Sequence, residues 1–370
     1  MTDDVLTGGS VIVYRLSDLG DEIDLAEADR VFVDSAPSRR RPGRVEARAL
    51  SIPTPPLVVS LGRRTLTVGA ESCEIECRAT LFDFGVVSVR LHLGLSAGLP
   101  WTRLAELVAS VQGHPALEAL AGELRDRLLE RLRPAVRALQ VAKVTEDYTV
   151  IRLDRLQDAT GAPGDPRALD EVRLGELLLP GGAALDPRTR SALLAHRSSY
   201  TVRDLTVLGW DAALVVEPDP ADTDLEQLLE FANAQLLELR VYDARLDRGL
   251  REMGNRITAA RRAAAGIFTR GYRALLIDLL TVVADVSELV ERAENAFKVT
   301  DDVYLGRVYT DAMRIFRADV WRADVARKLD TLRATYTMLN DETQTSRAHL
   351  MELAIVLLFV LDIALALLRP

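Results

Sequence analysis

Cysteine and histidine, which often bind metals or act as nucleophiles, are rare in this chain. Cys73 and Cys77 are the two cysteines. If both lie in one strand, their Cα atoms are about 13 Å apart, beyond the reach of a disulfide. The four histidines are scattered: His92, His114, His196 and His349. A structural zinc site needs four ligands close together, which these spacings do not supply. We expect two ordinary half-buried thiols and no metal.

One carboxylate, Asp83, stands between two phenylalanines in the stretch Phe82–Val87. Such a residue could act as a general acid or base, but no second acid or histidine follows at motif spacing. An outward-facing polar position is therefore the favoured interpretation. Gly85, inside what looks like a strand, predicts a bulge or the close approach of another backbone.

Arginines gather in the segment Ser35–Pro56, which is also rich in Pro and Ser. Four of them are Arg39, Arg40, Arg41 and Arg44. Guanidinium groups at this density could bind an anion. No aromatic or glycine-rich cradle accompanies them, so an exposed loop is favoured over a binding patch.

The sequence contains no P-loop, no dinucleotide-binding glycine fingerprint, no nucleophile elbow and no His-Glu-x-x-His motif. It therefore assigns no catalytic, cofactor-binding or metal-binding residue, and we expect no cofactor. The net charge of −9 and the aromatic content of 5% argue against direct nucleic-acid binding, which needs a basic surface. Lysine is almost replaced by arginine, which indicates a GC-rich, bacterial genome.

The pattern of residues 1–220 predicts an α+β domain. Val, Leu and Thr alternate with other residues in several short runs, as is typical of strands. The expected strands are Val11–Leu16, Leu57–Ser60, Thr65–Val68, a stretch within Glu74–Leu93, Tyr148–Leu153, and a hairpin formed by Tyr200–Trp210 and Ala212–Val216. The expected helices are Asp24–Phe32 and Trp101–Leu139, the second broken near Pro115 and Pro134.

Residues 221–349 are expected to form long helices, opened by a capping-box pattern at Thr223 and Glu226. Behind it, apolar residues recur in steps of four and three: Leu225, Leu229, Ala232, Leu236, Leu239, Leu246, Leu250, Met253 and Ile257. Asp243 is the one polar residue on this seam. Such a seam is typical of a helix about 50 Å long in an antiparallel bundle or coiled coil. Packing against the following helices is favoured over pairing between two chains.

An apolar run, Leu350–Leu368, ends the chain. As a helix it is about 28 Å long, close to the roughly 30 Å of a bilayer hydrocarbon core. Asp362 near its centre costs about 2.5–3.5 kcal/mol on insertion, while each Leu, Ile, Val or Phe returns about 0.3–0.6 kcal/mol. The sum favours insertion by about 2 kcal/mol. We predict a single-pass membrane anchor at 350–370, in which Asp362 faces another helix and favours a homo-oligomer.

The N-terminus shows no secretory signal, because the acidic Met1–Asp4 is followed by no long apolar run. The bulk of the chain is therefore expected in the cytoplasm, with membrane contact through residues 350–368.

Three stretches carry a family resemblance: Leu81–Val89, Ala232–Asp243, and Lys328–Asn340 continuing through Glu352 into the apolar run. In order and residue type they resemble membrane-anchored proteins named "required for meiotic nuclear division". Those proteins have an aromatic-Asp-aromatic-Gly strand, an Ala-x-Ala-Gln helix and a terminal membrane helix. The resemblance covers Cys73 to the C-terminus and implies a membrane-associated homo-oligomer. The family has no established catalytic residues that could be transferred.

Together, these features predict a tail-anchored scaffold or interaction protein of unidentified partner. One alternative is an enzyme of unrecognised class with its pocket in the α+β domain, where Asp83 or the segment Arg39–Arg44 would be the candidates. Another is a soluble oligomer in which Ile355–Leu368 forms a shared hub.

Overall fold

The computed structural model describes residues 5–33, 43–44, 54–69, 71–157, 162, 164–179, 184–219, 221–263 and 302–367. The chain divides into two compact units. Unit 1 comprises Met1–Val241 and Ala296–Asp319, and unit 2 comprises Tyr242–Asn295 and Val320–Pro370.

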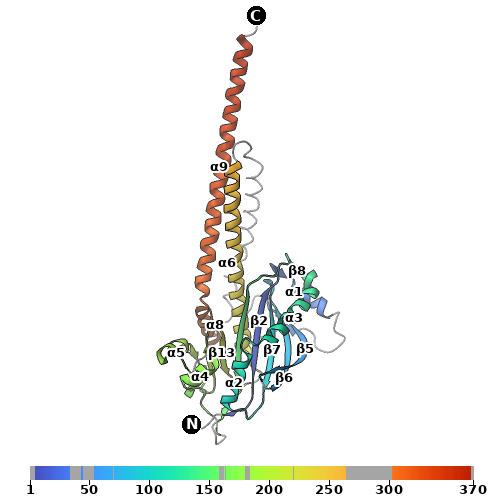
Figure 1. Ribbon diagram of the computed structural model, residues 1–370, viewed down its shortest axis with the longest axis vertical. Helices are drawn as coiled ribbons and strands as arrows, with labels where there is room; N and C mark the ends of the chain where they lie inside the picture. The colour runs from blue at the N-terminus through green and yellow to red at the C-terminus, as the bar shows by residue number, and fades with distance from the viewer. Residues whose placement is uncertain are drawn as a thin grey trace. The chain divides into compact units, whose positions relative to one another are not determined.

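In the described part of unit 1, nine strands form one large sheet (Figure 1). In spatial order they are β11 (Arg197–Ser198), β12 (Leu205–Leu208), β13 (Ala212–Val216), β9 (Thr145–Leu153), β2 (Gly9–Asp18), β7 (Val86–Leu95), β6 (Glu71–Leu81), β5 (Leu57–Val68) and β4 (Gly43–Arg44). Neighbours are antiparallel except β13 and β9, which are parallel, so the sheet is mixed. Two small sheets pair β1 (Val5–Leu6) with β10 (Leu156–Gln157), and β3 (Glu22–Ile23) with β8 (Val136–Arg137).

Alternation along β2 sends side chains into two layers, because successive residues of a strand point to opposite faces. Val11 and Val13 belong to the main apolar core. Ile12 and Tyr14 are equally buried but lie outside that core, and the Tyr14 hydroxyl donates to the backbone oxygen of Glu226 in a later helix. The sheet is therefore buried on both faces at β2.

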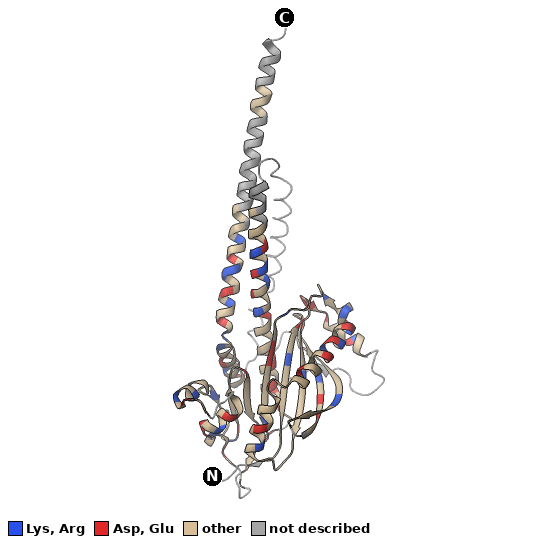
Figure 2. Cartoon of the chain, viewed as in Figure 1, with Lys and Arg blue, Asp and Glu red and all other residues tan. Residues whose placement is uncertain are grey.

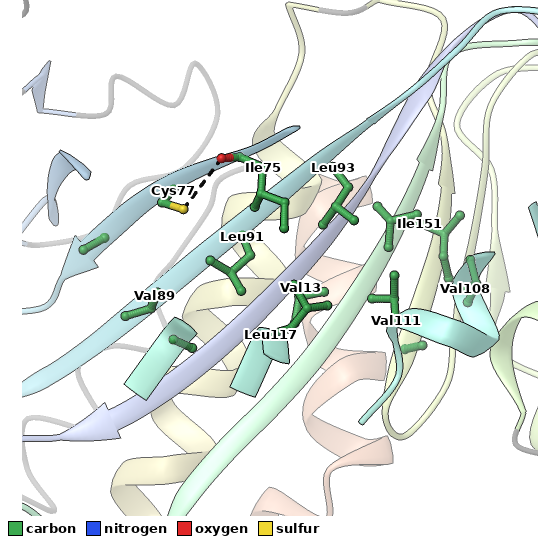
Figure 3. Close-up of a cluster of buried hydrophobic side chains, with 14 of the residues drawn as sticks. Val13, Ile75, Cys77, Val89, Leu91, Leu93, Val108, Val111, Leu117 and Ile151 are labelled. Atoms are coloured by element: carbon green, nitrogen blue, oxygen red, sulfur yellow. Dashed lines mark hydrogen bonds between the residues drawn. The ribbon is translucent and has the colours of Figure 1, made fainter. Parts of the chain in front are cut away.

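The main core lies between the sheet and the helices α1 (Leu25–Val33), α2 (Trp101–Val111), α3 (Pro115–Leu132) and α4 (Glu171–Leu178). Figure 3 shows the strand residues Val13, Leu91 and Ile151 beside Val111 of α2 and Leu117 of α3. The predicted helix break is confirmed, since α2 ends before the left-handed Gly113 and α3 begins at Pro115. A short helix, α5 (Pro187–Leu193), follows α4.

The opposite face of the sheet is covered by the first half of α6 (Asp224–Ala263) and by α8 (Val303–Ile315). Phe231 of α6 packs on Phe82, with ring centroids 6.0 Å apart. Phe316, which ends α8, packs edge-on against Tyr148 of β9 at 5.5 Å. Tyr309 of α8 also donates a hydrogen bond to Gln235 of α6. Unit 1 is thus a three-layer α+β unit, and the α+β part of the predicted fold is confirmed.

The stretch Glu74–Leu93 is two strands, β6 and β7, joined by a turn at Phe82–Gly85. Gly85 has φ +90°, and a Cβ at this position would overlap the backbone oxygen of Gly20. The backbone oxygen of Gly85 also accepts a hydrogen bond from the Leu19 amide at 3.0 Å. The close approach of another backbone, predicted from the sequence, is confirmed.

Replacing Gly85 by alanine should lower the free energy of unfolding by more than about 1 kcal/mol, because both the positive φ and the contact with Gly20 disfavour a side chain. Chemical denaturation measures the change. Gly122→Ala is the matched control, since Gly122 is helical with open space around its Cβ position and should be neutral or stabilising. Equal effects of the two substitutions would contradict the assignment.

Unit 2 contains the second part of α6, from Tyr242, and almost all of α9 (Ala318–Leu367). The two helices run in the same direction, with charges of both signs along them (Figures 1 and 2). Lys328 of α9 donates to Asp243 at 2.7 Å and lies 2.6 Å from Asp247. Asp243, the polar residue on the seam, is therefore the acceptor of an ion pair inside unit 2.

The predicted antiparallel bundle or coiled coil is wrong. The first half of the seam, from Leu225 to Leu239, is buried within unit 1. The second half belongs to unit 2, where Leu246 and Met253 are buried. One continuous apolar seam thus serves two different packing environments.

The predicted transmembrane anchor is also corrected. Among the described residues, no helix is both long enough and apolar enough to cross a membrane. The predicted margin was small because Glu352 and Asp362 interrupt the apolar run, which forms the end of the 50-residue helix α9. Ile355–Phe359 have exposed fractions of 52–66% within α9. The single-pass membrane localisation and the oligomer role given to Asp362 are withdrawn with the anchor.

Candidate functional site

The residues that the sequence offered for chemistry do not form a site. Asp83 lies half-buried in the β6–β7 turn, where its backbone oxygen accepts from the Ile23 amide at 2.8 Å. It lines none of the cavities described below. Arg39, Arg40 and Arg41 fall outside the described residues, and Arg44 lies in the edge strand β4.

Neither cysteine forms a disulfide, and both lie in β6 as expected. Cys77 is fully buried in the main core and Cys73 is half-buried against it. Burial raises the pKa of the Cys77 thiol, which keeps it protonated and unreactive at neutral pH. The prediction of half-buried thiols is confirmed for Cys73, whereas Cys77 is buried completely. In the described ranges, no cluster of Cys, His, Asp or Glu could hold a metal ion.

A cavity of about 650 Å³, here called the acidic cavity, opens in unit 1 where four loops meet. The loops follow β9, precede β12, connect β13 to α6, and precede α8. Its lining includes six carboxylates and two guanidiniums: Asp204, Glu217, Asp219, Asp222, Asp224, Asp302, Arg155 and Arg203. The charged lining therefore carries a formal charge of −4, six negative charges against two positive ones.

Several of these carboxylates also hold the loops in shape. Asp204, which is 5% exposed, accepts from the amides of Tyr200 and Thr201, each at 2.7 Å. This contact keeps Tyr200 and Thr201 in a loop, which explains why β12 starts at Leu205 instead of the predicted Tyr200. Asp302 caps α8 by accepting from the amides of Tyr304 and Leu305. The fold thus fixes the negative charges at the cavity.

Two tyrosines supply the aromatic part of the lining. The rings of Tyr200 and Tyr304 lie 5.6 Å apart and are tilted by 46°. Tyr304 is held by a hydrogen bond with Thr206 at 3.0 Å, whereas Tyr200 has an exposed fraction of 74%. A ring face presented to a carboxylate-lined cavity attracts cations through the quadrupole of the ring.

The carboxylates contribute to raised pKa values of two groups at the acidic cavity, Tyr304 and Glu217. Burial raises the pKa of Tyr304 to about 12; the hydrogen bond with Thr206 opposes this, and Asp204, Glu217 and Asp222 add to it. Burial, with Asp222 and Asp204, likewise raises the pKa of Glu217. Negative charge is therefore disfavoured at this cavity, and a cation that entered it would relieve the repulsion.

A smaller cavity of about 300 Å³, here called the basic cavity, lies between the sheet and the start of α6. Three arginines and a histidine line it: Arg78, Arg90, Arg152 and His92. Its acids are Glu76, Asp154 and Glu226, which balance the three arginines in formal charge, so the name refers to the arginines alone. Burial lowers the pKa of His92. The nearby arginines lower it further and Glu76 opposes them, so the imidazole is neutral at neutral pH.

Arg152 of β9 anchors the loop that separates the two cavities. Its guanidinium, 7% exposed, donates to the Glu226 carboxylate at 2.7 Å. It also donates to the backbone oxygens of Asp219 and Asp222, at 2.7 and 2.6 Å. The helix begins at Asp224 as the capping pattern predicted, but Glu226 binds Arg152. The sequence could not reveal this pair, because 74 residues separate its members.

Arg152→Met should lower the free energy of unfolding by about 3–5 kcal/mol, since it leaves the 1%-exposed Glu226 as an unpaired buried charge. The denaturation midpoint of the full chain measures this. Arg155→Met, a neighbouring exposed arginine, is the control and should change stability by less than about 1 kcal/mol. A loss for Arg152→Met no larger than that of the control would contradict the anchoring role.

The fold and its cavities define a mixed-sheet α+β protein with charged pockets at the loops around β13 and α6. By sequence, the chain belongs to the family described as "Uncharacterized protein MJ0711, N-terminal domain", whose model matches residues 8–223. This range holds all nine strands of the large sheet and the loop anchored by Arg152, and it ends where α6 begins.

A relative is the uncharacterized protein MJ0711 of Methanocaldococcus jannaschii, which is 22% identical over 264 residues. The match covers 71% of this chain and 78% of the relative. No solved structure matches the chain. The resemblance to proteins "required for meiotic nuclear division" was wrong, since the family model and the relative both point elsewhere. The expected bacterial source is corrected too, because this relative is archaeal.

Proposed function

We propose that unit 1 is a binding module, part of an interaction protein, that takes a cationic group in the acidic cavity. The observation that carries the proposal is a pair of tyrosine rings in a cavity whose charged lining is net negative. The ligand chemistry is an ammonium or guanidinium group. A basic segment of a protein partner and a free polyamine both present it.

The size of the cavity supports a ligand larger than a simple ion. Pockets of about 300–1,000 Å³ accommodate small molecules or several side chains, and the acidic cavity falls within that range. Tyr200 contributes an exposed ring at little entropic cost, because an aromatic side chain has few rotatable bonds. Cation binding would combine the ring faces with long-range attraction by the carboxylates.

The rival hypothesis of an enzyme finds less support in the cavity lining. Asp204 and Asp302 accept hydrogen bonds from backbone amides, and Glu217 accepts one from the Asp219 amide at 2.9 Å. Carboxylates that accept hydrogen bonds from backbone amides stabilise loops, whereas a general base must be able to take a proton from the substrate. The described lining presents no histidine or cysteine. Binding without chemistry is therefore the better account.

Titration calorimetry on the full chain tests the proposal with three probes: an arginine-rich peptide, its citrulline-substituted counterpart, and spermine. Binding of the arginine peptide and not the citrulline peptide is expected, with affinity falling as salt rises. A stronger signal with spermine would assign the site to a free polyamine. Absence of binding by both cationic probes at millimolar concentration, or equal binding of the neutral peptide, would reject the function.

Tyr200→Ala should weaken binding of the cationic probe about threefold to thirtyfold, because the exposed ring face is lost. Tyr200→Phe keeps the ring and should bind nearly as well as the unmodified chain. Calorimetric affinities of both variants provide the comparison. A loss of the same size in the two variants would place the contact at the hydroxyl and contradict the cation–π contribution.

Cation affinity should increase as pH rises from near 4.5 toward neutral. Because the pKa of Glu217 is raised from its ordinary value of 4.5, part of this carboxyl is still protonated at pH values just above 4.5. The cation binds better once that proton leaves. Affinities at pH 5 and pH 7 test this, with circular dichroism confirming the fold at both. In Glu217→Gln the difference should shrink, and an unchanged difference would exclude Glu217 as its source.

A further inference from the structure

Arg90 of β7 presents an unusual guanidinium at the basic cavity. It lines the cavity and lies over the Tyr14 ring, 5.8 Å from the centroid. Among the described residues, it has no hydrogen bond and no ion pair within 4.0 Å. A cation–π contact compensates only part of the cost of removing a guanidinium from water. The donors of Arg90 therefore lack acceptors.

The other arginines of the basic cavity are already satisfied. Arg78 donates through two nitrogens to one oxygen of Glu76, at 2.9 and 2.7 Å. Arg152 is held by Glu226 and by the backbone oxygens in the β13–α6 loop, with Asp154 at 3.8 Å. The three acids of the cavity are thus all taken by two arginines. Arg90 remains as the cation that could accept a ligand.

A further acid, Glu230, interacts electrostatically with Arg90 without forming an ion pair with it. Glu230 of α6 is 3% exposed, and its Oε1 has no hydrogen-bond partner among the described residues. Burial raises the pKa of Glu230, while Arg90, Ser88 and Thr80 oppose the rise. Among the described residues, Glu230 thus acts on Arg90 only at longer range and forms no ion pair with it within 4.0 Å.

We infer that the basic cavity is an oxyanion site, in which Arg90 binds a phosphate or carboxylate group with help from His92 and Thr223. Both helper residues line the cavity, and Thr223 immediately precedes α6, whose N-terminal end favours negative charge. A volume of about 300 Å³ fits a free oxyanion or the anionic end of a small metabolite. The fork of a guanidinium matches two oxygens of either group.

This site is distinct from the acidic cavity and takes ligands of opposite charge. Its lining shares no residue with that of the acidic cavity. The inference therefore does not depend on the proposed cation binding, and either can fail alone. The loop anchored by Arg152 forms part of both linings, through Thr223 on one side and Asp222 on the other.

The test uses the full chain with inorganic phosphate and with succinate as probes, followed by calorimetry and by nitrogen-15 spectra of histidine-labelled protein. We expect saturable binding of at least one probe and an upward shift of the His92 titration when the anion is bound, because a nearby anion favours the imidazolium. The tighter probe identifies the class of oxyanion. If neither probe binds at a concentration of about 10 mM, the inference is overturned.

Arg90→Met should lower the affinity for the bound probe at least about tenfold. Arg90→Lys keeps the charge but not the forked guanidinium, and should lower the affinity less. Arg133→Met is the control and should bind the anion as the unmodified chain does, since the exposed Arg133 lines none of the cavities described. If Arg90→Met does not fold, the affinities of Arg90→Lys and His92→Gln for the anion still test the site. Unchanged affinity in both of those folded variants would reject the site.

Discussion

The ion pair between Arg152 and Glu226 is the contact on which the organisation of unit 1 depends. Arg152 stands on a central strand, and Glu226 stands in the first turn of the 40-residue helix α6. By also binding two backbone oxygens of the intervening loop, Arg152 fixes where the helix begins and which face of the sheet it covers. The desolvation of two buried charges is offset here by several hydrogen bonds to one guanidinium.

The two cavities follow from that anchor. The loop between β13 and α6 contributes carboxylates to one side and a threonine to the other, so a single arrangement of backbone forms part of a net-negative lining and part of an arginine-containing one. Local capping by Asp204 and Asp302 sets the remaining walls of the acidic cavity. None of these residues belongs to a known motif, because each carboxylate is positioned by its own loop and not by a fixed spacing along the chain.

Local features were well predicted from the sequence. The strand at Val11–Leu16, the break before Pro115 and the special backbone at Gly85 all depend on alternation, proline chemistry or the missing Cβ, which are properties of neighbouring residues. The seam of α6 was seen correctly but assigned to the wrong partner, since periodicity shows that a face is apolar and not what covers it. The same limit applied to the apolar end of α9. The cavity residues were missed because Tyr200 and Tyr304 meet only through the fold.

The position of β2 in the sheet has a consequence for synthesis of the chain. This strand lies between β7 and β9, and its pairing with β9 joins residues as far apart as Gly9 and Leu153. At about 5–20 residues per second, a ribosome needs roughly 7–29 seconds to make the 144 residues from Ser10 to Leu153. During that time one edge of β2 has no partner from its own sheet. The first strand of the large sheet is therefore one whose nascent edge needs protection until β9 is made.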